Sequence, residues 1–302
     1  MIRPQRLCGG WVAGAATLLL AVAACDPATE PGPPSEAARQ ATESVAAEHA
    51  HDSGEPGPGA AIAPERAVVA ETLAYAEVDE RLVYGHFVFP SDMVDPLPAV
   101  IVVHEWWGLN DGVRAMADRL AAEGYIVLAV DLFGGRVAED PEAARKLMME
   151  SLENPKAAHE NIRQAYRFVS ETAGAPRVAA LGWCFGGTWA LNAALLFPEE
   201  LDAAVIYYGQ VTSDPDALAG LRVPILGHFA ANDRSIPLPT VETFRQALDA
   251  AGVVHDIRIY PNVGHAFANP SGRSYDADAA AQAWELSLAF LAQHLAVPAM
   301  AN

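Results

Sequence analysis

The sequence of 302 residues is poor in cysteine and in positive charge. It contains 3 cysteines, and its 19 lysines and arginines face 38 aspartates and glutamates, which gives a formal net charge of -19. A field of this sign repels phosphate backbones and anionic lipid surfaces, so it argues against nucleic acid or a bare membrane surface as a general partner. An anionic substrate would need cations placed locally.

Signals for a cofactor are also lacking. No glycine-rich phosphate loop follows a first predicted strand, and the main domain has no His or Cys cluster with metal-ligand spacing. We therefore expect neither a metal nor an organic cofactor. His49 and His51, in "EHAHD", could capture a metal weakly, but we interpret this stretch as a solvated linker.

The first residues are typical of an export signal. Arg3 and Arg6 precede an apolar stretch, residues 11–24, that is too short to span a bilayer comfortably and ends in "AVAAC". This ending resembles a bacterial lipoprotein signal, which implies removal of residues 1–24 and lipidation of Cys25. The protein would then be exported and anchored by its lipid, facing the periplasm or the cell exterior. An ordinary secreted protein, or a signal anchor with an incidental Cys25, is the alternative.

The segment that follows is predicted to be a flexible tether, residues 25–65. It is rich in proline, glycine, alanine and glutamate and has no sustained apolar period, so it cannot bury enough surface to offset its ordering entropy. With Cys8 removed and Cys25 acylated, Cys184 would be the single thiol left, and no internal disulfide could form. Residues 66–297 then form one domain of catalytic size.

Residues 66–297 predict an α/β fold with a doubly wound, mostly parallel sheet and an antiparallel strand pair at its start. Residues 67–78 and 81–90 have strand patterns and are joined at Asp79 and Glu80. Nearly continuous apolar runs then alternate with helical spacing, a pattern typical of strands covered on both faces. Ligands of such sheets gather beyond the carboxyl ends of the strands. The runs are residues 99–105, 125–133, 177–184, 201–209, 222–230 and 253–261.

Residues suited to catalysis follow these runs. "GWCFG" fits the nucleophile elbow Gly-x-Ser-x-Gly with Cys184 in place of serine, and the N-terminus of the next helix favours a thiolate there. Asp233 and then His265 follow in the chain order that this fold uses for its acid and base. Each has a structural alternative: Cys184 could be a small buried residue, Asp233 a turn or cap residue, and His265 a loop histidine. His104 and His228 lie elsewhere in the order, and we expect them to be structural.

Five segments together resemble the dienelactone hydrolase family of α/β-hydrolases: "HEWWGLN", "DLFGG", "GWCFGG", "ANDRSIP" and "GHAFANPSG". The resemblance covers roughly residues 75–295. It implies Cys184 as nucleophile, His265 as base and Asp233 as the residue that orients it. It further implies that Glu105 contacts the resting thiol and helps to generate the thiolate, and that the backbone amides of Trp106 and Phe185 form the oxyanion hole.

The substrate-binding positions depart from the family's pattern. Members that act on dienelactone hold its carboxylate with two arginines. Arg136 matches the first, in a loop one residue longer, whereas Asn269 stands at the second, with Arg273 farther along. The loss of one charged partner predicts that neutral lactones or short esters are accepted at least as well as dienelactone. Glu105 has a structural alternative, as a cap of the helix that begins near Asn110.

Together these residues predict a hydrolase of small-molecule esters or lactones that uses a Cys-His-Asp triad and an acyl-enzyme intermediate. Peptidase activity is disfavoured. The alternative is a lipid-tethered binding protein that keeps a hydrolase fold without turnover, since fold does not imply function. The physiological substrate and the oligomeric state are left open by the sequence.

Overall fold

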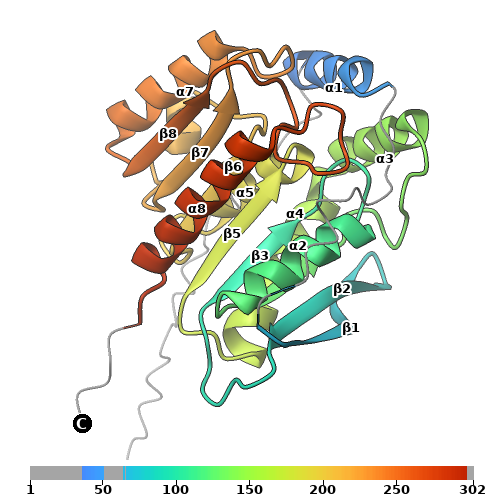
Figure 1. The fold of residues 1–302 in the computed structure, drawn as a ribbon, viewed down its shortest axis with the longest axis vertical. Helices are drawn as coiled ribbons and strands as arrows, with labels where there is room; N and C mark the ends of the chain where they lie inside the picture. Colours follow the sequence, from blue (N-terminus) through green and yellow to red (C-terminus); the bar gives the residue numbers. More distant parts are fainter. Residues whose placement is uncertain (1–35, 51–63, 65, 298–302) are drawn as a thin grey trace, which may run out of the picture. The chain divides into compact units, whose positions relative to one another are not determined.

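The computed structural model describes residues 36–50, 64 and 66–297, and its centre is an eight-stranded sheet (Figure 1). The strand order is β1-β2-β4-β3-β5-β6-β7-β8. The β1–β2 and β2–β4 pairs are antiparallel, and the other neighbours are parallel, as the sequence predicted. The strands are β1 (Val68–Val78), β2 (Arg81–Pro90), β3 (Ala99–Val103), β4 (Ile126–Val130), β5 (Val178–Trp183), β6 (Ala203–Tyr207), β7 (Ile225–Ala230) and β8 (His255–Tyr260).

The first two strands form the predicted hairpin. Asp79 and Glu80 connect them, and both have positive φ, 50° and 61°. Two consecutive left-handed residues are typical of the tight hairpin turn whose twist matches that of the flanking strands. The antiparallel entry to the sheet is therefore confirmed.

Helices cover both faces of the sheet. In Figure 1, α2 and α8 lie on the near face, while α4 and α5 lie behind the strands. The central strands β3 to β7 are buried along their whole length, which explains their continuous apolar runs. The helices are α1 (Glu36–Glu48), α2 (Asp111–Ala122), α3 (Pro141–Glu153), α4 (Pro155–Arg167), α5 (Phe185–Leu196), α6 (Pro215–Leu218), α7 (Leu238–Ala251) and α8 (Ala277–His294). Among the residues described, no helix has the length and apolar character needed to cross a membrane.

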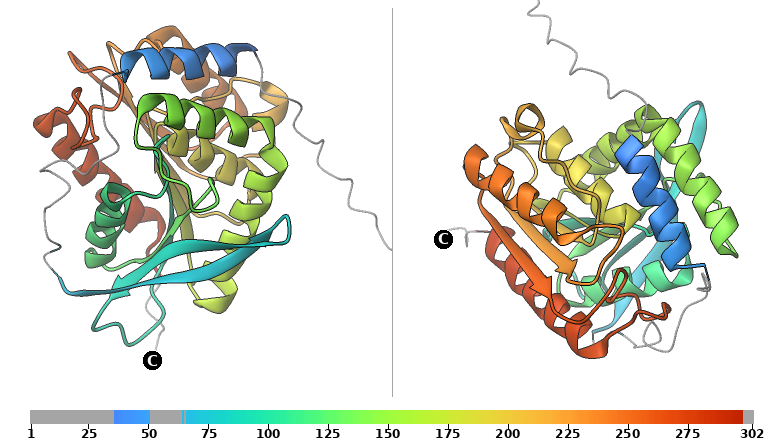
Figure 2. Two further views of the ribbon diagram at one scale, coloured as in Figure 1. Left: turned by 90° about the vertical axis from the view of Figure 1, so that its right-hand side faces the viewer. Right: turned by 90° about the horizontal axis from the view of Figure 1, so that it is seen from above.

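A helix lies inside the segment that was predicted to be a tether. α1 packs beside α3, as Figure 2 shows from two directions. Its side chains Thr42 and Val45, three residues apart and so on one helical face, are buried. On its exposed side, Glu43 pairs with Arg145 of α3 at 2.9 Å. For residues 36–48 the structure therefore differs from the predicted tether.

The physical reason lies in the alanine-rich sequence of α1, "EAARQATESVAAE", which favours a helix, and in the surface that covers its apolar face. The tether prediction used the composition of residues 25–65 as a whole, in which the proline and glycine residues on either side of α1 outweighed its alanines. The predicted signal peptide, residues 1–24, and the lipidation candidate Cys25 lie outside the described residues.

Candidate active site

The four predicted catalytic residues lie at the carboxyl ends of four parallel strands. Glu105 follows β3, Cys184 lies between β5 and α5, Asp233 follows β7, and His265 follows β8. Because these strand ends share one edge of the sheet, residues distant in sequence meet there.

The turn at Cys184 is sharp and tightly packed. Cys184 has a φ of 54°, in the left-handed region that non-glycine residues seldom adopt, and its N–H donates to the carbonyl of Tyr207 at 2.9 Å. A Cβ atom on Gly182 would lie 2.1 Å from the carbonyl oxygen of Gly186, and one on Gly186 would lie 2.1 Å from that of Val103. The two glycines therefore permit the close backbone approach that presents Cys184.

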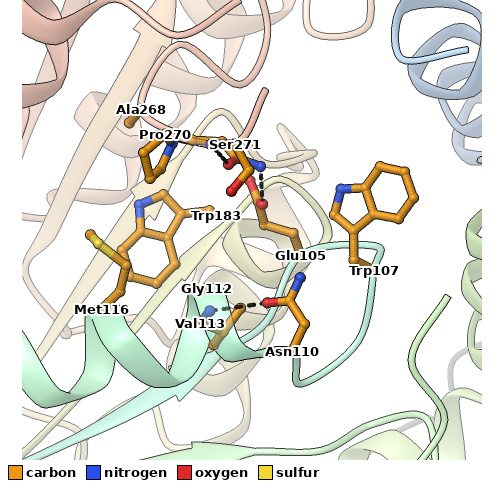
Figure 3. Close-up of a pocket in the computed structure, with 11 residues that line it drawn as sticks. Glu105, Trp107, Asn110, Gly112, Val113, Met116, Trp183, Ala268, Pro270 and Ser271 are labelled. Carbon is orange, nitrogen blue, oxygen red and sulfur yellow. Dashed lines mark hydrogen bonds between the residues drawn. The ribbon is translucent and has the colours of Figure 1, made fainter. Parts of the chain in front are cut away.

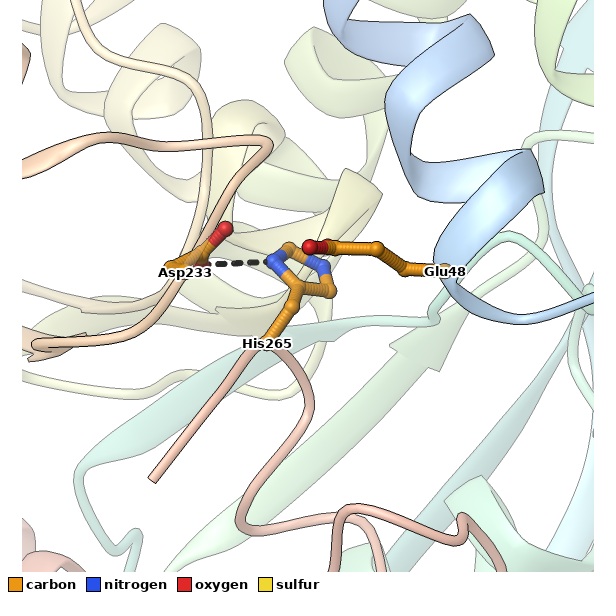
Figure 4. Close-up of side chains that lie close together, drawn as sticks. All are labelled: Glu48, Asp233 and His265. Atoms are coloured by element: carbon orange, nitrogen blue, oxygen red, sulfur yellow. Dashed lines mark hydrogen bonds and ion pairs between the residues drawn. The ribbon is translucent and has the colours of Figure 1, made fainter. Parts of the chain in front are cut away.

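Asp233 and His265 form a buried pair (Figure 4). The Nδ1 of His265 donates to Oδ2 of Asp233 at 2.8 Å. The other oxygen, Oδ1, accepts from the N–H groups of Ser235 and Ile236, each at 2.8 Å. Burial alone would raise the pKa of Asp233, but the charge of His265 and these hydrogen bonds outweigh it, so the pKa lies below its ordinary value. A charged Asp233 thus fixes the tautomer and orientation of His265.

His265 and Cys184 line the same small cavity and interact electrostatically. Its free nitrogen, Nε2, is buried and makes no conventional hydrogen bond with any residue that the structure describes. Burial alone would lower the pKa of His265, but interactions with Cys184 and Asp233 outweigh it and hold the pKa well above its ordinary value. The site therefore favours an imidazolium beside the sulfur.

Glu105 lies in a neighbouring cavity of about 30 Å³ (Figure 3). Its Oε2 accepts a hydrogen bond from Nδ2 of Asn269 at 2.5 Å, and Oδ1 of Asn269 accepts from the N–H of Ser271 at 2.8 Å. The cap of α2 is Asn110, whose side chain accepts from the N–H of Val113 at 3.0 Å. The capping alternative for Glu105 is therefore wrong.

The candidate cations are placed elsewhere. Arg136 pairs through Nη1 with Glu150 at 2.6 Å and donates through Nε to the carbonyl of Phe133 at 2.9 Å. Within the described part of the chain, neither Arg136 nor Arg273 lines the cavity of Glu105 or the cavity that contains Cys184. Of the substrate-binding candidates, the structure brings Asn269 alone to these cavities.

The candidate oxyanion donors lie on the two expected loops. Trp106 follows β3, and Phe185 is the first residue of α5. The N–H groups of the first helical turn have no acceptor within their own helix, so that of Phe185 is available to a ligand. Both side chains are buried.

His104 and His228 are structural, as predicted. Nε2 of His104 accepts from the N–H of Leu132 at 3.1 Å, and burial lowers its pKa. His228 makes hydrogen bonds with the hydroxyls of Tyr260 and Ser287 at 2.9 and 3.0 Å, and burial lowers its pKa to about 3. A neutral histidine satisfied on both nitrogens needs no catalytic role.

Two contacts with His265 were not predicted from the sequence. Tyr208 lies edge-on to it, with ring centroids 5.1 Å apart. His49, just after α1, lies 5.4 Å from His265 and 6.0 Å from Trp106 by the same measure, and it is buried. The linker interpretation of His49 is therefore wrong. The signal that could have shown this contact is the position of "EHAHD" at the end of a helical pattern.

One group of possible metal ligands occurs among the described residues. Glu48, Asp233 and His265 each bring a ligand atom within 4.8 Å of the others (Figure 4). The carboxylate of Glu48 already accepts from Oγ of Ser235 at 2.9 Å and from the N–H of Arg234 at 3.2 Å. Asp233 is hydrogen-bonded through both of its oxygens, so a hydrogen-bond network that uses both carboxylates accounts for the closeness of the three residues.

The same residues lie within a match to a known family. The sequence model of the family described as "Dienelactone hydrolase family" matches residues 84–295, which include the elbow, the acid and the base. The chain belongs to the dienelactone hydrolase family. It is therefore a hydrolase with the predicted α/β fold, whereas α1 lies outside the matched residues.

Relatives of this dienelactone hydrolase family member support the assignment. A protein of Aquifex aeolicus provisionally named carboxymethylenebutenolidase is 34% identical over 205 residues, which are 66% of this chain and 89% of that protein. A protein of Escherichia coli K12 with the same provisional name is 33% identical over 248 residues, which are 76% of this chain and 89% of that protein. A crystal structure titled as a provisional dienelactone hydrolase from Klebsiella pneumoniae has 30% identity and a TM-score of 0.68, over 76% of this chain and 100% of that one.

Proposed function

We propose that this hydrolase cleaves carboxylic ester or lactone bonds with Cys184 as nucleophile, His265 as base and Asp233 as its orienting acid. The observation that carries the proposal is the 2.8 Å hydrogen bond from His265 to a buried, charged Asp233, together with the small cavity that His265 and the elbow residue Cys184 both line. Covalent catalysis needs a nucleophile, a base next to it and a group that orients the base. A binding protein without turnover has no need of them.

In the acylation step, the thiol of Cys184 gives its proton to Nε2 of His265, and Sγ attacks the carbonyl carbon. The new C–S bond turns the carbonyl oxygen into an oxyanion, which accepts hydrogen bonds from the N–H groups of Trp106 and Phe185. When the oxyanion collapses, the C–O bond to the alcohol breaks, and His265 protonates the departing alkoxide. In a lactone the two products remain one molecule, bound as a thioester.

In the deacylation step, neutral His265 takes a proton from water while the water oxygen attacks the thioester. Collapse of this second oxyanion breaks the C–S bond and releases the acid, and the sulfur and His265 again share the proton. Asp233 stabilises the imidazolium that forms in both steps. Glu105 acts on the thiol before attack, by the family resemblance, and its hydrogen bond with Asn269 sets its position between cycles.

The substrate class that fits this site is a neutral lactone or short ester. Glu105 adds a carboxylate to the cavity that Asn269 lines, and Arg136 is paired with Glu150. A substrate carboxylate would therefore meet a negative group without an arginine to offset it. The net charge of -19 gives no electrostatic steering toward an anion.

The test is an acyl burst with p-nitrophenyl acetate, followed by steady turnover. We expect one burst equivalent per active site, and we expect Cys184→Ala to lose the burst and to lower kcat by about a thousandfold or more. Full turnover in Cys184→Ala would contradict the triad, and binding without a burst in the unmodified enzyme would favour the binding protein. A second assay, which follows ring opening directly, compares kcat/KM for a carboxylated lactone and its methyl ester, and preference for the anion would contradict the neutral substrate class.

A further inference from the structure

The helix α1 meets the proposed active site directly, although it precedes the residues that match the family. We propose that α1 forms one wall of the acyl-binding pocket, with Val45 as a residue that determines how long an acyl chain the enzyme accepts. This inference rests on the proposed function, because it names the substrate class of that same site.

The pocket is a small cavity of about 60 Å³. Its lining includes Cys184 and His265, Met148 and Leu152 of α3, and Thr42 and Val45 of α1. Apart from the reacting pair Cys184 and His265, every side chain that lines this cavity is uncharged. An apolar acyl group would be desolvated there without leaving a buried charge unpaired.

α1 is fixed over this pocket by contacts at its C-terminal end. The carboxylate of Glu48 accepts from the loop that follows Asp233, at 2.9 Å from Oγ of Ser235 and 3.2 Å from the N–H of Arg234. Beyond it, His49 packs edge-on against His265. The wall is therefore held by the same loops that carry the acid and the base.

The position of the nucleophile shows which part of the substrate lies here. In the acyl-enzyme, the acyl chain starts at Sγ of Cys184 while its carbonyl oxygen lies at the N–H of Phe185. Both residues line this cavity, whereas the cavity of Glu105 and Asn269 is lined by neither. We infer that the apolar acyl chain extends toward α1 and that the cavity of Glu105 and Asn269 is left for the alcohol part.

The size of the cavity limits the chain. One small group needs about 10–15 Å³ of such space, so roughly four to six non-hydrogen atoms fit. We expect good turnover of acyl groups up to about five carbons and a steep fall beyond them.

The experiment changes Val45 in the full chain and measures kcat/KM for p-nitrophenyl acetate, butyrate and hexanoate. Val45→Ala makes room for about two methylene groups and should raise the hexanoate-to-acetate ratio about tenfold. Val45→Phe should lower the butyrate-to-acetate ratio by about the same factor. Ala47→Phe, on the exposed side of the same helix, is the matched control and should leave both ratios unchanged.

Cys184→Ala, measured with the same esters, separates the two levels of the proposal. Turnover that persists without Cys184 would overturn the proposed function. Turnover that depends on Cys184, with both ratios unchanged in Val45→Ala and Val45→Phe, would overturn the role of α1 and leave the proposed function standing.

Discussion

His265 is buried, yet its pKa lies well above the ordinary histidine value. Burial lowers the pKa of His265, but the interactions with Cys184 and Asp233 raise it by more. The raised pKa means that the imidazolium persists at pH values where a free histidine is neutral. Once the thiol has given its proton to His265, the raised pKa keeps that proton on the ring until the leaving group takes it up.

Replacing Cys184 with alanine should lower the pKa of His265, because one of the two groups that stabilise the imidazolium is removed while burial remains. The measurement is a titration of the imidazole ¹⁵N chemical shifts by NMR. His228, with a pKa of about 3, is an internal control that should stay neutral from pH 5 to 9 in both proteins. An identical midpoint for His265 in the two proteins would contradict the coupling to Cys184.

The placement of Cys184, Asp233 and His265 at one edge of the sheet could be predicted, because each follows an apolar run in the sequence; their catalytic roles remain a proposal. Gly182 and Gly186 are demanded by a tight turn, and the order of nucleophile, acid and base follows from the fold. The position of Arg136 could not be predicted, because its ion pair with Glu150 depends on how α3 packs. Similarly, the bond between Glu105 and Asn269 joins residues 164 positions apart.

The helix α1 is an example of an element whose stability comes from distant partners. Its 13 residues are about the length at which an isolated helix is marginal in water. Glu48 reaches partners 186 and 187 positions along the chain. Composition over a long window, which was the basis of the tether prediction, carries no information about such contacts. The strands and α2 were predictable because their own apolar period and cap residues specify them.

Glu48→Ala should loosen α1, because it removes a charged acceptor from two hydrogen bonds. We expect the amide hydrogens of α1 to exchange about tenfold faster or more, as measured by hydrogen exchange with mass spectrometry. Glu43→Gln weakens the exposed ion pair with Arg145 and serves as the control, with a change of less than about fivefold. Equal exchange in Glu48→Ala and the unmodified protein would show that Glu48 does not hold the helix.

At the scale of the whole molecule, the acidic surface and the proposed lipid anchor have separate roles. A net charge of -19 does not attract an anionic membrane surface, so acyl chains on Cys25 would supply the membrane affinity. The proposal of a lipid anchor rests on the sequence around Cys25, which lies outside the residues that the structure describes.

Cys25→Ser should release the protein from membranes or leave it unprocessed, because serine cannot carry the thioether-linked lipid of this signal type. Membrane fractionation with intact-mass analysis checks both results. Cys184→Ala, which removes a thiol from the folded domain, is the control and should stay with the membrane fraction. If the protein with its natural sequence has a mass without acyl chains, the signal is of the ordinary secreted type.

Because one polypeptide joins α1 to the strands, the helix is an intramolecular ligand of the surface that it covers beside α3. Its effective concentration there is set by the length of the connecting residues 49–67 and does not change when the protein is diluted. Cleavage of that connection in a purified sample would leave α1 on a separate fragment, and binding of this fragment to the surface would then depend on protein concentration. The acyl-chain selectivity of a cleaved sample would consequently relax on dilution, while that of the intact chain would stay constant.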